Sequence, residues 1–394
     1  MPSASSRKGW RILIALLVYN GEEFVGPCIE SLAALDPGEF EVDILVLDDA
    51  SPAPGWSERC RSAAERKGFG YYRTPRNLGI PRNMNLGMLR AVDAGYDAVI
   101  LLNSDTVLPR NLVPTLVRPL IDDPSISSTT AWSNNVSIYS LPNELPDRLG
   151  ARPELVSWIS EQLDLEFCGQ IIPVPSGVGF CMALPTSAID RVGLMDPLFG
   201  RGYSEEIDWC LRSHSEGFSS VLVPSCFVYH AGSGITRAEG MVGQGDHIVH
   251  AHQSIIDHRH PHYRSELIAF TASNVTDQLK ERGLRAIVRA AARDRGYRVE
   301  VSRLSHRTGD ESRVRFVIEP DATVPVICGW YEGFRADFAV EDGGVIPTVA
   351  SLVGIPPEEI RIFSQGPASD HLLQHLGDVR ASIVRQPAYR ESVF

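Results

Sequence analysis

The sequence predicts an α/β protein, with a mostly parallel sheet covered by helices on both faces and a smaller C-terminal α/β domain. Three observations predict this class. Over the first 130 residues, short aliphatic runs alternate with segments of helical periodicity, as in βαβ units. The aliphatic runs are continuous, which is typical of parallel strands buried on both faces. The 394 residues, 43% of them hydrophobic, suffice for a sizeable core and two domains.

The first elements follow one another in a regular order. The expected strands are Ile12–Val18, Val42–Leu47, Gly70–Arg73 and Ala98–Leu102, and the helices between them are Glu22–Ala34, Ser57–Lys67 and Arg82–Ala94. In such sheets ligands bind beyond the carboxyl ends of the strands. Polar residues stand there in three cases: Tyr19–Asn20, Asp48–Asp49 and Asn103–Asp105. The sequence therefore predicts a site at that edge of the sheet.

The later part of the chain is less regular. Residues 131–175 are rich in Pro, Asn and Ser, and we expect loops around one helix, Pro153–Leu165. Further expected elements are a strand at Val174–Leu184, a helix at Glu205–Ser215, strand-like segments at Val221–Val223 and Phe227–Tyr229, a basic amphipathic helix at Asp277–Arg295, and strands at Arg298–Leu304, Arg313–Ile318 and Val324–Cys328. The character of the chain changes near residue 265, which predicts two domains, 1–264 and 265–394.

Charge and cysteine content exclude some classes. A net charge of −12 argues against nucleic acid as a main partner, because that would need a basic footprint. The seven cysteines form no Cys-x-x-Cys pair, which favours buried thiols in a reducing compartment. Residues Met1–Trp10 are polar, no signal peptide is visible, and Ile12–Val18 is too short to span a bilayer. We therefore expect a cytoplasmic protein without a transmembrane segment.

Asp105 is a candidate metal ligand. It follows the strand Ala98–Leu102, so its carboxylate is expected to project into the ligand crevice. There it can hold a divalent cation against a diphosphate, since Mg²⁺ and Mn²⁺ prefer oxygen ligands. His230 ends another strand, and its imidazole can complete such a site. A turn-capping role for Asp105 and a structural role for His230 are the alternatives.

Three carboxylates stand within four residues at Glu205, Glu206 and Asp208. Adjacent acids repel one another, so the cluster is costly unless cations or function compensate. One of them can act as the general base that deprotonates a hydroxyl group. The alternative is the acidic first turn of a helix, which explains one acid of the three.

Two other segments have both functional and structural interpretations. The Gly- and Asn-rich turn Arg76–Asn85 can offer backbone N–H groups and two Arg side chains to phosphate, or it is a plain connection. The segment Gly240–His262 contains six histidines. It is interpreted as a lid over a diphosphate or as a solvated connector between the domains, with a second metal site as a third alternative.

In this order, the segments resemble a family 2 glycosyltransferase with the GT-A nucleotide-diphospho-sugar transferase fold, over residues 10–235. The resemblance rests on Val18-Tyr19-Asn20, Val46–Ser51, Asn77-Leu78-Gly79, Leu102–Asp105, Ser133-Asn134-Asn135, Gly177–Phe180, Glu205–Asp208 and His230. Within the family, the chain most resembles the rhamnosyltransferase-like branch. The resemblance implies an enzyme that moves a hexosyl or deoxyhexosyl group from a nucleoside-diphosphate sugar to a hydroxyl acceptor (a glycan, lipid-linked glycan or natural product).

The resemblance also assigns roles to residues. The residues expected to bind the donor are Tyr19, Glu23, Asp48, Asp49, Asn77, Arg82, Asn103 and Ser104. Asp105 and His230 match the ligands of Mn²⁺ or Mg²⁺, although Asn103 stands where the family's Asp-x-Asp motif has its first Asp. Glu206 matches the catalytic base, which is usually Asp in the family. Asp208 matches a second acid that orients the site, and Arg212 is expected to neutralise it.

The implied reaction is inverting, because Glu206 takes the proton as the acceptor oxygen attacks the anomeric carbon from the opposite face. Two other functions stay open. A nucleotidyltransferase would have a Gly- and Lys/Arg-rich loop after the first strand, whereas Val18–Glu23 contains one Gly and no basic residue. A non-catalytic sugar-nucleotide-binding protein is suggested by Asn103.

The C-terminal domain lies outside the resemblance. Its basic helix Asp277–Arg295 can contact an anionic membrane surface, or its apolar face can pack on a partner subunit or on the catalytic domain. Peripheral membrane association and a homo-oligomer formed through this domain are therefore both open.

Overall fold

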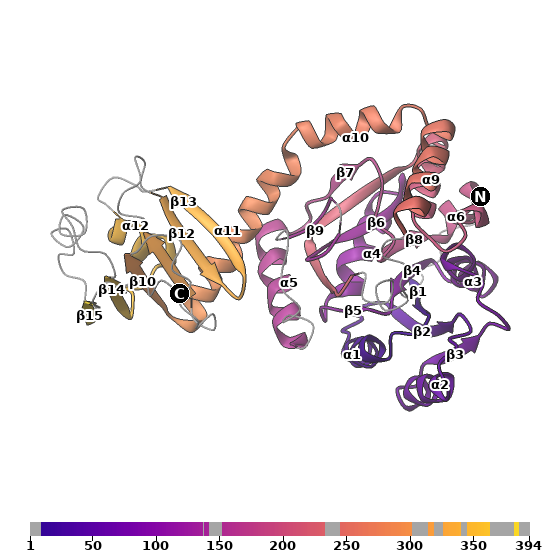
Figure 1. Cartoon of the computed structure of the whole chain (residues 1–394), viewed down its shortest axis with the longest axis horizontal. Coiled ribbons are helices and arrows are strands. Elements are labelled where there is room, and N and C mark those ends of the chain that lie inside the picture. Colours follow the sequence, from indigo (N-terminus) through magenta and orange to yellow (C-terminus); the bar gives the residue numbers. More distant parts are fainter. Residues whose placement is uncertain are drawn as a thin grey trace, which may run out of the picture. The chain divides into compact units, whose positions relative to one another are not determined.

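The computed structural model describes residues 9–136, 138–141, 152–232, 245–301, 314–318, 326–339, 345–362 and 382–385. The chain divides into two compact units, Met1–Thr276 and Asp277–Phe394, each with its own sheet (Figure 1). Our prediction of two functional domains, 1–264 and 265–394, stays a proposal. In the described part of the chain, no helix has both the length and the apolar character needed to cross a membrane.

The first unit is built on one sheet with the strand order β3-β2-β1-β4-β8-β6-β9-β5, to which β7 adds by pairing with β9. The strands are β1 Arg11–Val18, β2 Glu41–Asp48, β3 Gly70–Arg73, β4 Ala98–Asn103, β5 Thr106–Val107, β6 Ile126–Ser133, β7 Ile172–Val174, β8 Cys181–Pro185 and β9 Ser219–His230. The pairs β1–β2, β1–β4, β2–β3 and β6–β9 are parallel. The four pairs that β8, β5 and β7 add are antiparallel.

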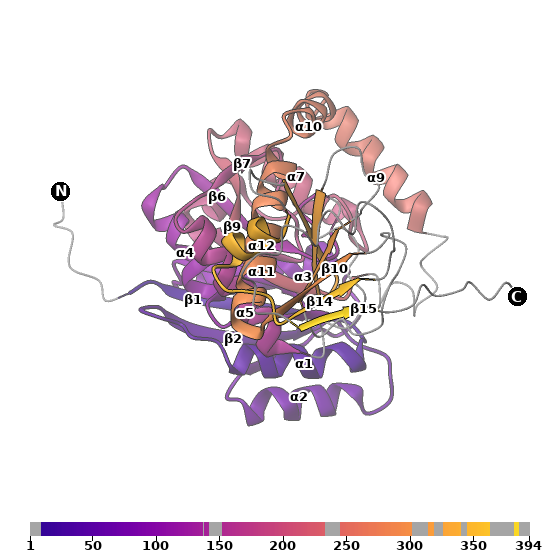
Figure 2. The same ribbon diagram turned by 90° about the vertical axis from the view of Figure 1, so that its left-hand side faces the viewer.

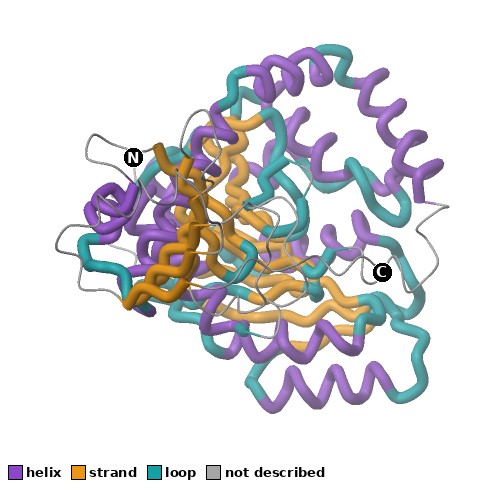
Figure 3. Tube along the Cα trace, turned by 60° about the vertical axis from the view of Figure 1, so that its left-hand side comes forward, coloured by secondary structure: helices purple, strands orange, loops and turns teal. Residues whose placement is uncertain are grey.

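Helices cover both faces of this sheet (Figure 3). They are α1 Glu22–Ala33, α2 Trp56–Arg66, α3 Ile80–Asp93, α4 Leu112–Asp122, α5 Pro153–Phe167, α6 Thr186–Val192, α7 Glu205–Ser215, α9 Gly245–Arg259 and α10 Tyr263–Ala272, with a short 3₁₀ helix at Pro197–Phe199. Alternate residues of β1 enter two different cores. Ile14 packs with residues of α1, α2 and α4, and Leu13 packs with residues of α3, α6 and α7. Figure 2 shows α1 and α2 side by side.

The second unit holds a smaller sheet with the order β13-β12-β11-β10-β14-β15. Its elements are α11 Val275–Arg295, β10 Tyr297–Val301, β11 Val314–Ile318, β12 Val326–Tyr331, β13 Phe334–Ala339, α12 Val345–Val353, β14 Glu359–Ile362 and β15 Ser382–Arg385. The buried residues Ile287, Val288 and Ala291 line α11. Gly329 of β12 lets this helix approach the sheet, because a Cβ there would lie 2.6 Å from Val288. The α/β class of both parts is thus confirmed.

The middle of the chain differs from the sequence predictions in three details. The strand expected at Val174–Leu184 is divided into β7 and β8 by residues 175–180. The segments Val221–Val223 and Phe227–Tyr229 belong to one strand, β9, whose register against β6 shifts between them. Strand β6 lies partly in the region where we expected loops around one helix. Its Ser and Thr residues, all buried, do not produce the aliphatic run used to find strands.

The C-terminal predictions were incomplete. The amphipathic helix and the three strand segments that follow it appear as α11, β10, β11 and β12, with β12 reaching Tyr331. Residues 302–313 and 324–325, within or beside those predicted segments, lie outside the described residues. Strands β13, β14 and β15 and helix α12 were not predicted.

Candidate functional site

The parallel register of the sheet brings the predicted strand ends together. Val18 pairs with Asp48, and Leu17 pairs with Asn103, so β1, β2 and β4 end at one edge. Tyr19 is half-buried there, and Glu23 is exposed in the first turn of α1. The loops after β1 and β2 enclose a pocket of about 340 Å³ lined by Asn20, Gly21, Glu22, Pro52, Ala53 and Trp56.

Asp48 organises the loop after β2. Its side chain is fully buried, and Ser51 donates to Oδ1 from both its N–H and its hydroxyl, at 2.9 and 2.6 Å. The hydroxyls of Ser57 and Tyr71 donate to Oδ2 at 2.7 Å each. Burial opposes ionisation, but these hydrogen bonds keep the pKa of Asp48 below its usual value. The carboxylate is therefore ionised and bound within the protein, and its predicted contact with a nucleotide remains a proposal.

Asp49 fastens the turn before α3. Its carboxylate accepts the N–H groups of Leu78 (2.8 Å) and Gly79 (2.9 Å) and the hydroxyl of Thr74 (3.0 Å). Asn77 also accepts the N–H of Gly79 through Oδ1, at 3.0 Å. Arg82 is exposed in the first turn of α3. The turn that we interpreted as a phosphate contact is thus fixed to the end of β2.

Gly79 is where this turn meets the segment that leads to α7. Its φ is 84° and its ψ 162°, a conformation open essentially to Gly alone. A Cβ there would lie 2.0 Å from the carbonyl oxygen of Gly200. The close approach puts the Asp49-bound turn directly against the residues that precede Glu205.

Gly79→Ala is expected to lower the free energy of unfolding by about 3–5 kcal/mol, because backbone strain and a backbone clash add. Gly95→Ala is the matched control. Gly95 also has a positive φ, 70°, but a Cβ there would meet nothing within 4 Å. For Gly95→Ala we expect a loss of about 1–2 kcal/mol in the free energy of unfolding, from backbone strain alone. Urea unfolding of both variants checks this, and equal losses would contradict the close approach at Gly79.

Asp105 and His230 come together as predicted for a metal site. Oδ1 of Asp105 lies 3.2 Å from Nε2 of His230, across the pairing of β5 with β9. The side chain of Asn134 accepts the backbone N–H of His230 (2.8 Å) and donates to its carbonyl (3.0 Å). The ring of Phe180 stacks on the imidazole with centroids 5.1 Å apart. Both predicted ligands are therefore held rigidly.

The pair fits a divalent cation. Nδ1 of His230 lies 3.0 Å from the carbonyl oxygen of Asn135, so Nδ1 carries the proton when the ring is neutral. Nε2 and the Asp105 carboxylate are then two acceptors facing each other, so either a proton or a divalent cation has to lie between them. Two neighbouring ligands at bond lengths of about 2.1 Å lie about 3 Å apart, close to the observed distance. The carbonyl of Asn135 is the outer partner that metal-binding imidazoles commonly have.

Without a metal, a proton takes that place. Burial opposes both charges, but the attraction between the two groups lowers the pKa of Asp105 and raises the pKa of His230. In the described part of the chain, no cluster of three or more His, Cys, Asp or Glu could hold a metal. This also applies to residues 245–262 of the His-rich segment. A cation at Asp105 and His230 would therefore complete its coordination with water or a bound phosphate.

The predicted donor residues beside Asp105 are more enclosed. Ser104 is buried, and Asn103 is half-buried. The N–H of Asn103 donates to the carbonyl of Phe180 at 2.8 Å, and its carbonyl accepts the hydroxyl of Thr106 at 2.8 Å. The backbone of Asn103 is thus fixed by the same residue that stacks on His230.

The connection between β7 and β8, residues 175–180, contacts both His230 and Glu206. Phe180 contacts His230, and its neighbour Gly179 contacts Glu206. A Cβ on Gly179 would lie 3.4 Å from the Cβ of Glu206, and the backbone N–H of Gly179 hydrogen-bonds to that carboxylate. The same short connection therefore contacts both His230 and Glu206.

The three acids of α7 differ in state. Burial raises the pKa of Glu205 well above its ordinary value, and the charge of Glu206 raises it further. Burial also raises the pKa of Glu206, although backbone N–H groups reduce the shift. One oxygen of each carboxylate, Oε2, has no hydrogen-bond partner among the described residues. An unpaired carboxylate oxygen and a raised pKa are features that a general base would have.

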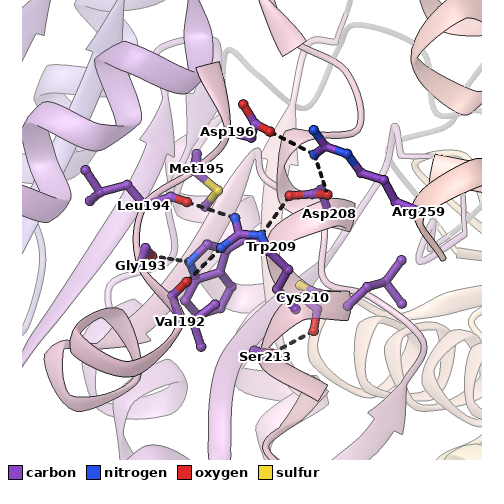
Figure 4. Close-up of polar contacts among 12 residues, drawn as sticks. Val192, Gly193, Leu194, Met195, Asp196, Asp208, Trp209, Cys210, Ser213 and Arg259 are labelled. Atoms are coloured by element: carbon purple, nitrogen blue, oxygen red, sulfur yellow. Dashed lines mark hydrogen bonds and ion pairs between the residues drawn. The ribbon is translucent and has the colours of Figure 1, made fainter. Parts of the chain in front are cut away.

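Asp208, by contrast, is ionised and fully paired. Its side chain is buried, and Arg212 donates to Oδ2 at 2.8 Å, as predicted. Arg259 and His260 lie 3.1 and 3.2 Å from Oδ1 (Figure 4 shows Arg259 bridging Asp208 and Asp196). Although burial opposes it, these partners lower the pKa of Asp208. The sequence analysis missed Arg259 and His260, and the only signal was that they lie in the His-rich segment.

Glu205→Gln is expected to change how stability depends on pH. A raised folded-state pKa gives stability that is present below the unfolded value, near 4.5, and lost as pH rises through the folded value. Glu205→Gln removes that loss. Above that unfolded value, the free energy of unfolding of the variant should rise relative to that of the wild type by up to about 1.4 kcal/mol per pH unit. Urea unfolding between pH 4.5 and 8 measures the difference, and a constant gap would contradict the raised pKa.

Residues 14–182 match the model of Glycosyl transferase family 2, which supports a glycosyltransferase. The matched segment runs from β1 into β8 and includes the Asp48–Asp49 pair and Asp105. The sheet order and this match agree with the expected GT-A fold. A search of curated proteins found no match.

Three solved structures that this chain resembles have low sequence identity to it. GalNAc-T7 with UDP, GalNAc and Mn²⁺ has 15% identity and a TM-score of 0.44, covering 56% of this chain and 43% of its own. The mannosyltransferase PcManGT from Pyrobaculum calidifontis, in complex with GDP-Man and Mn²⁺, has 16% identity and a TM-score of 0.46, covering 73% and 76%. TarS 1–349 of S. aureus with UDP-GlcNAc has 14% identity and a TM-score of 0.40, covering 56% and 58%. This chain thus spans less than half of the first of them.

Proposed function

We propose that this protein is an inverting glycosyltransferase that moves a sugar from a nucleoside-diphosphate sugar to a hydroxyl acceptor, assisted by a divalent cation. One observation carries the proposal. A single connection, Gly179–Phe180, touches both a pair that can hold a cation, Asp105 and His230, and a half-buried residue with a carboxylate of raised pKa, Glu206. Such a site has a place for a diphosphate and a base for a hydroxyl group. The family match of residues 14–182 supports it.

The donor is proposed to bind along the edge where β1, β2 and β4 end. The pocket of about 340 Å³ has a volume in the range of small-molecule sites and could take the nucleoside. Tyr19 and Glu23 lie in the loop and helix that border it, and Asn77 and Arg82 lie at the start of α3. Asn103 and Ser104 lead to Asp105, which would face the diphosphate.

The cation is proposed to be Mn²⁺ or Mg²⁺ on Asp105 and His230. When bound, it supplies positive charge against the diphosphate that leaves. Asn103 in place of a carboxylate lowers the negative charge beside it, which favours a cation that is completed by the donor's own phosphate oxygens.

Glu206 is proposed to act on the acceptor. Its carboxylate takes the hydroxyl proton while the acceptor oxygen forms a bond to the anomeric carbon, and the bond from that carbon to the diphosphate oxygen breaks. Attack opposite the leaving group inverts the configuration. Asp208 does not take the proton in this scheme, because Arg212, Arg259 and His260 already stabilise its charge.

The experiment that tests the function measures sugar release and transfer from UDP-, GDP- and dTDP-sugars, with and without Mn²⁺. Metal-dependent turnover of at least one of them is expected. If none is bound or turned over, the proposal is wrong. The assay with dTDP-rhamnose tests the rhamnosyltransferase-like branch, because the family match does not distinguish branches.

The proposed setting of the enzyme is the cytoplasm, where nucleotide sugars and reduced thiols are compatible with a chain whose cysteines are free. Contact of α11 with an anionic membrane and self-association through the second unit remain proposals. Sedimentation of the protein with and without anionic vesicles separates them.

A further inference from the structure

The turn that carries Glu206 into the site is strained. Tyr203 and Ser204, directly before α7, have φ values of 71° and 75°. Residues with a Cβ adopt this left-handed conformation at a cost and keep it only where neighbouring structure holds them. Gly202, with a φ of 116°, precedes them. Something must therefore hold residues 202–204, and Glu206 depends on it for its position.

One such neighbour is His252 of α9. Its Nδ1 lies 3.0 Å from the carbonyl oxygen of Gly202 and 3.0 Å from that of Tyr203. Because both partners accept, Nδ1 carries the proton and donates to them. The imidazole edge also meets the ring of Phe199, with centroids 5.3 Å apart at 88°. His252 thus holds two carbonyl groups of the strained turn by hydrogen bonds from one imidazole ring.

The end of the same helix holds α7 from the other side of Glu206. Arg259 donates through one nitrogen to Asp208 (3.1 Å) and to Asp196 (2.8 Å), as Figure 4 shows. Asp208 is two residues beyond Glu206 in the first turns of α7, and its other oxygen accepts from Arg212. Because the Asp208 carboxylate is buried, removing Arg259 should cost more than breaking an ion pair on the surface.

Apolar contacts fix α9 between these two anchors. Ile256 of α9 and Tyr263, the first residue of α10, are buried in one cluster with Phe199 and with Leu211 of α7. The hydroxyl of Tyr263 lies 3.0 Å from the hydroxyl of Ser176, close to the connection that contacts Glu206. This packing differs from the solvated connector that was one of our alternatives for this segment. The lid alternative partly concerns residues 240–244, which lie outside the described residues.

We propose that His252 and Arg259 are positioning residues for Glu206. They act from α9 on the two sides of the base, His252 on the backbone before it and Arg259 on Asp208 after it. Neither needs to touch a substrate. The inference rests on the proposed role of Glu206 as the base, and it gives the His-rich segment a function that is independent of metal binding and of a lid.

The test compares kcat and donor KM for His252→Ala and Arg259→Ala with those of the wild type, using the donor found active. A displaced base should lower kcat roughly ten- to a hundredfold with donor KM within about threefold, because small misplacements of reacting groups are costly. His252→Asn places an amide nitrogen where Nδ1 was, and Arg259→Lys keeps a donor, so both should recover part of the loss. His258→Ala, an exposed histidine of the same helix, is the matched control and should behave as the wild type.

A second measurement does not depend on turnover. Amide hydrogen exchange in a peptide covering residues 200–210 should be faster in both alanine variants than in the wild type and in His258→Ala. Unchanged kcat, a joint loss of kcat and donor affinity, or unchanged exchange overturns the positioning role. A wild type that transfers sugar from no donor overturns this proposal together with the function, whereas an active wild type with unaffected variants overturns this proposal alone.

Discussion

Glu206→Gln is expected to lower kcat for sugar transfer by roughly 10²–10⁴-fold, the usual contribution of a general base. Gln has nearly the same size as Glu but cannot accept the acceptor's proton. The change leaves the packing against Gly179 in place, so donor KM should change little. Steady-state kinetics with the active donor, together with thermal unfolding to check the fold, measure the effect.

Glu205→Gln is the matched control for this variant. Burial and the neighbouring Glu206 raise the pKa of Glu205 well above its usual value, so its carboxyl is expected to be neutral already. An amide at this position should therefore keep kcat within a few-fold of the wild type. If Glu206→Gln kept full activity, the base would be another group. Donor binding without any transfer in the wild type would favour the non-catalytic alternative.

Asp105→Asn is expected to lower kcat/KM for the donor by about 10²–10³-fold and to weaken Mn²⁺ binding. The substitution removes the carboxylate that lies 3.2 Å from His230, and the lost charge stabilisation of a leaving diphosphate is of this size. Activity measured against Mn²⁺ concentration tests the first effect. Calorimetric titration of Mn²⁺ with a nucleoside diphosphate present tests the second without turnover.

Two comparisons sharpen this test. Chelation with EDTA should reproduce the loss in the wild type, and added Mn²⁺ should reverse it. Asn103→Asp should have the opposite effect on Mn²⁺ affinity, because it adds a carboxylate at a half-buried position two residues before Asp105. Full activity of the chelated wild type would rule out the metal role assigned to Asp105 and His230.

Local patterns predicted much of the site. Because β1, β2 and β4 each contain a continuous aliphatic run, their ends could be located from the sequence, and the polar residues at those ends marked the edge where Asp48, Asp49 and Asp105 lie. The helix Glu205–Ser215 was predicted with its observed bounds. Strand β6 was missed because its buried residues are hydroxyl-bearing.

The contacts between distant segments could not be predicted in the same way. The distance of 3.2 Å between Asp105 and His230 depends on the pairing of β5 with β9, and the position of Glu206 depends on Gly179 and α9. From the sequence, Asp48 and Asp49 had the same predicted role in donor binding. In the structure, Asp48 holds the loop after β2, and Asp49 holds the turn before α3.

The amino-acid sequence was sufficient to predict the α/β class and the edge of the sheet where the candidate site residues gather. Aliphatic runs and turn residues fix these, because they act through neighbours in the chain. Folding in three dimensions pairs Asp208 with Arg259 of α9 as well as with Arg212 of its own helix, and leaves one carboxylate oxygen each of Glu205 and Glu206 without a partner among the described residues. The physical reason is that the pKa of a carboxylate depends on burial and on charges within a few ångströms. Those neighbours are set by packing between segments far apart in the sequence.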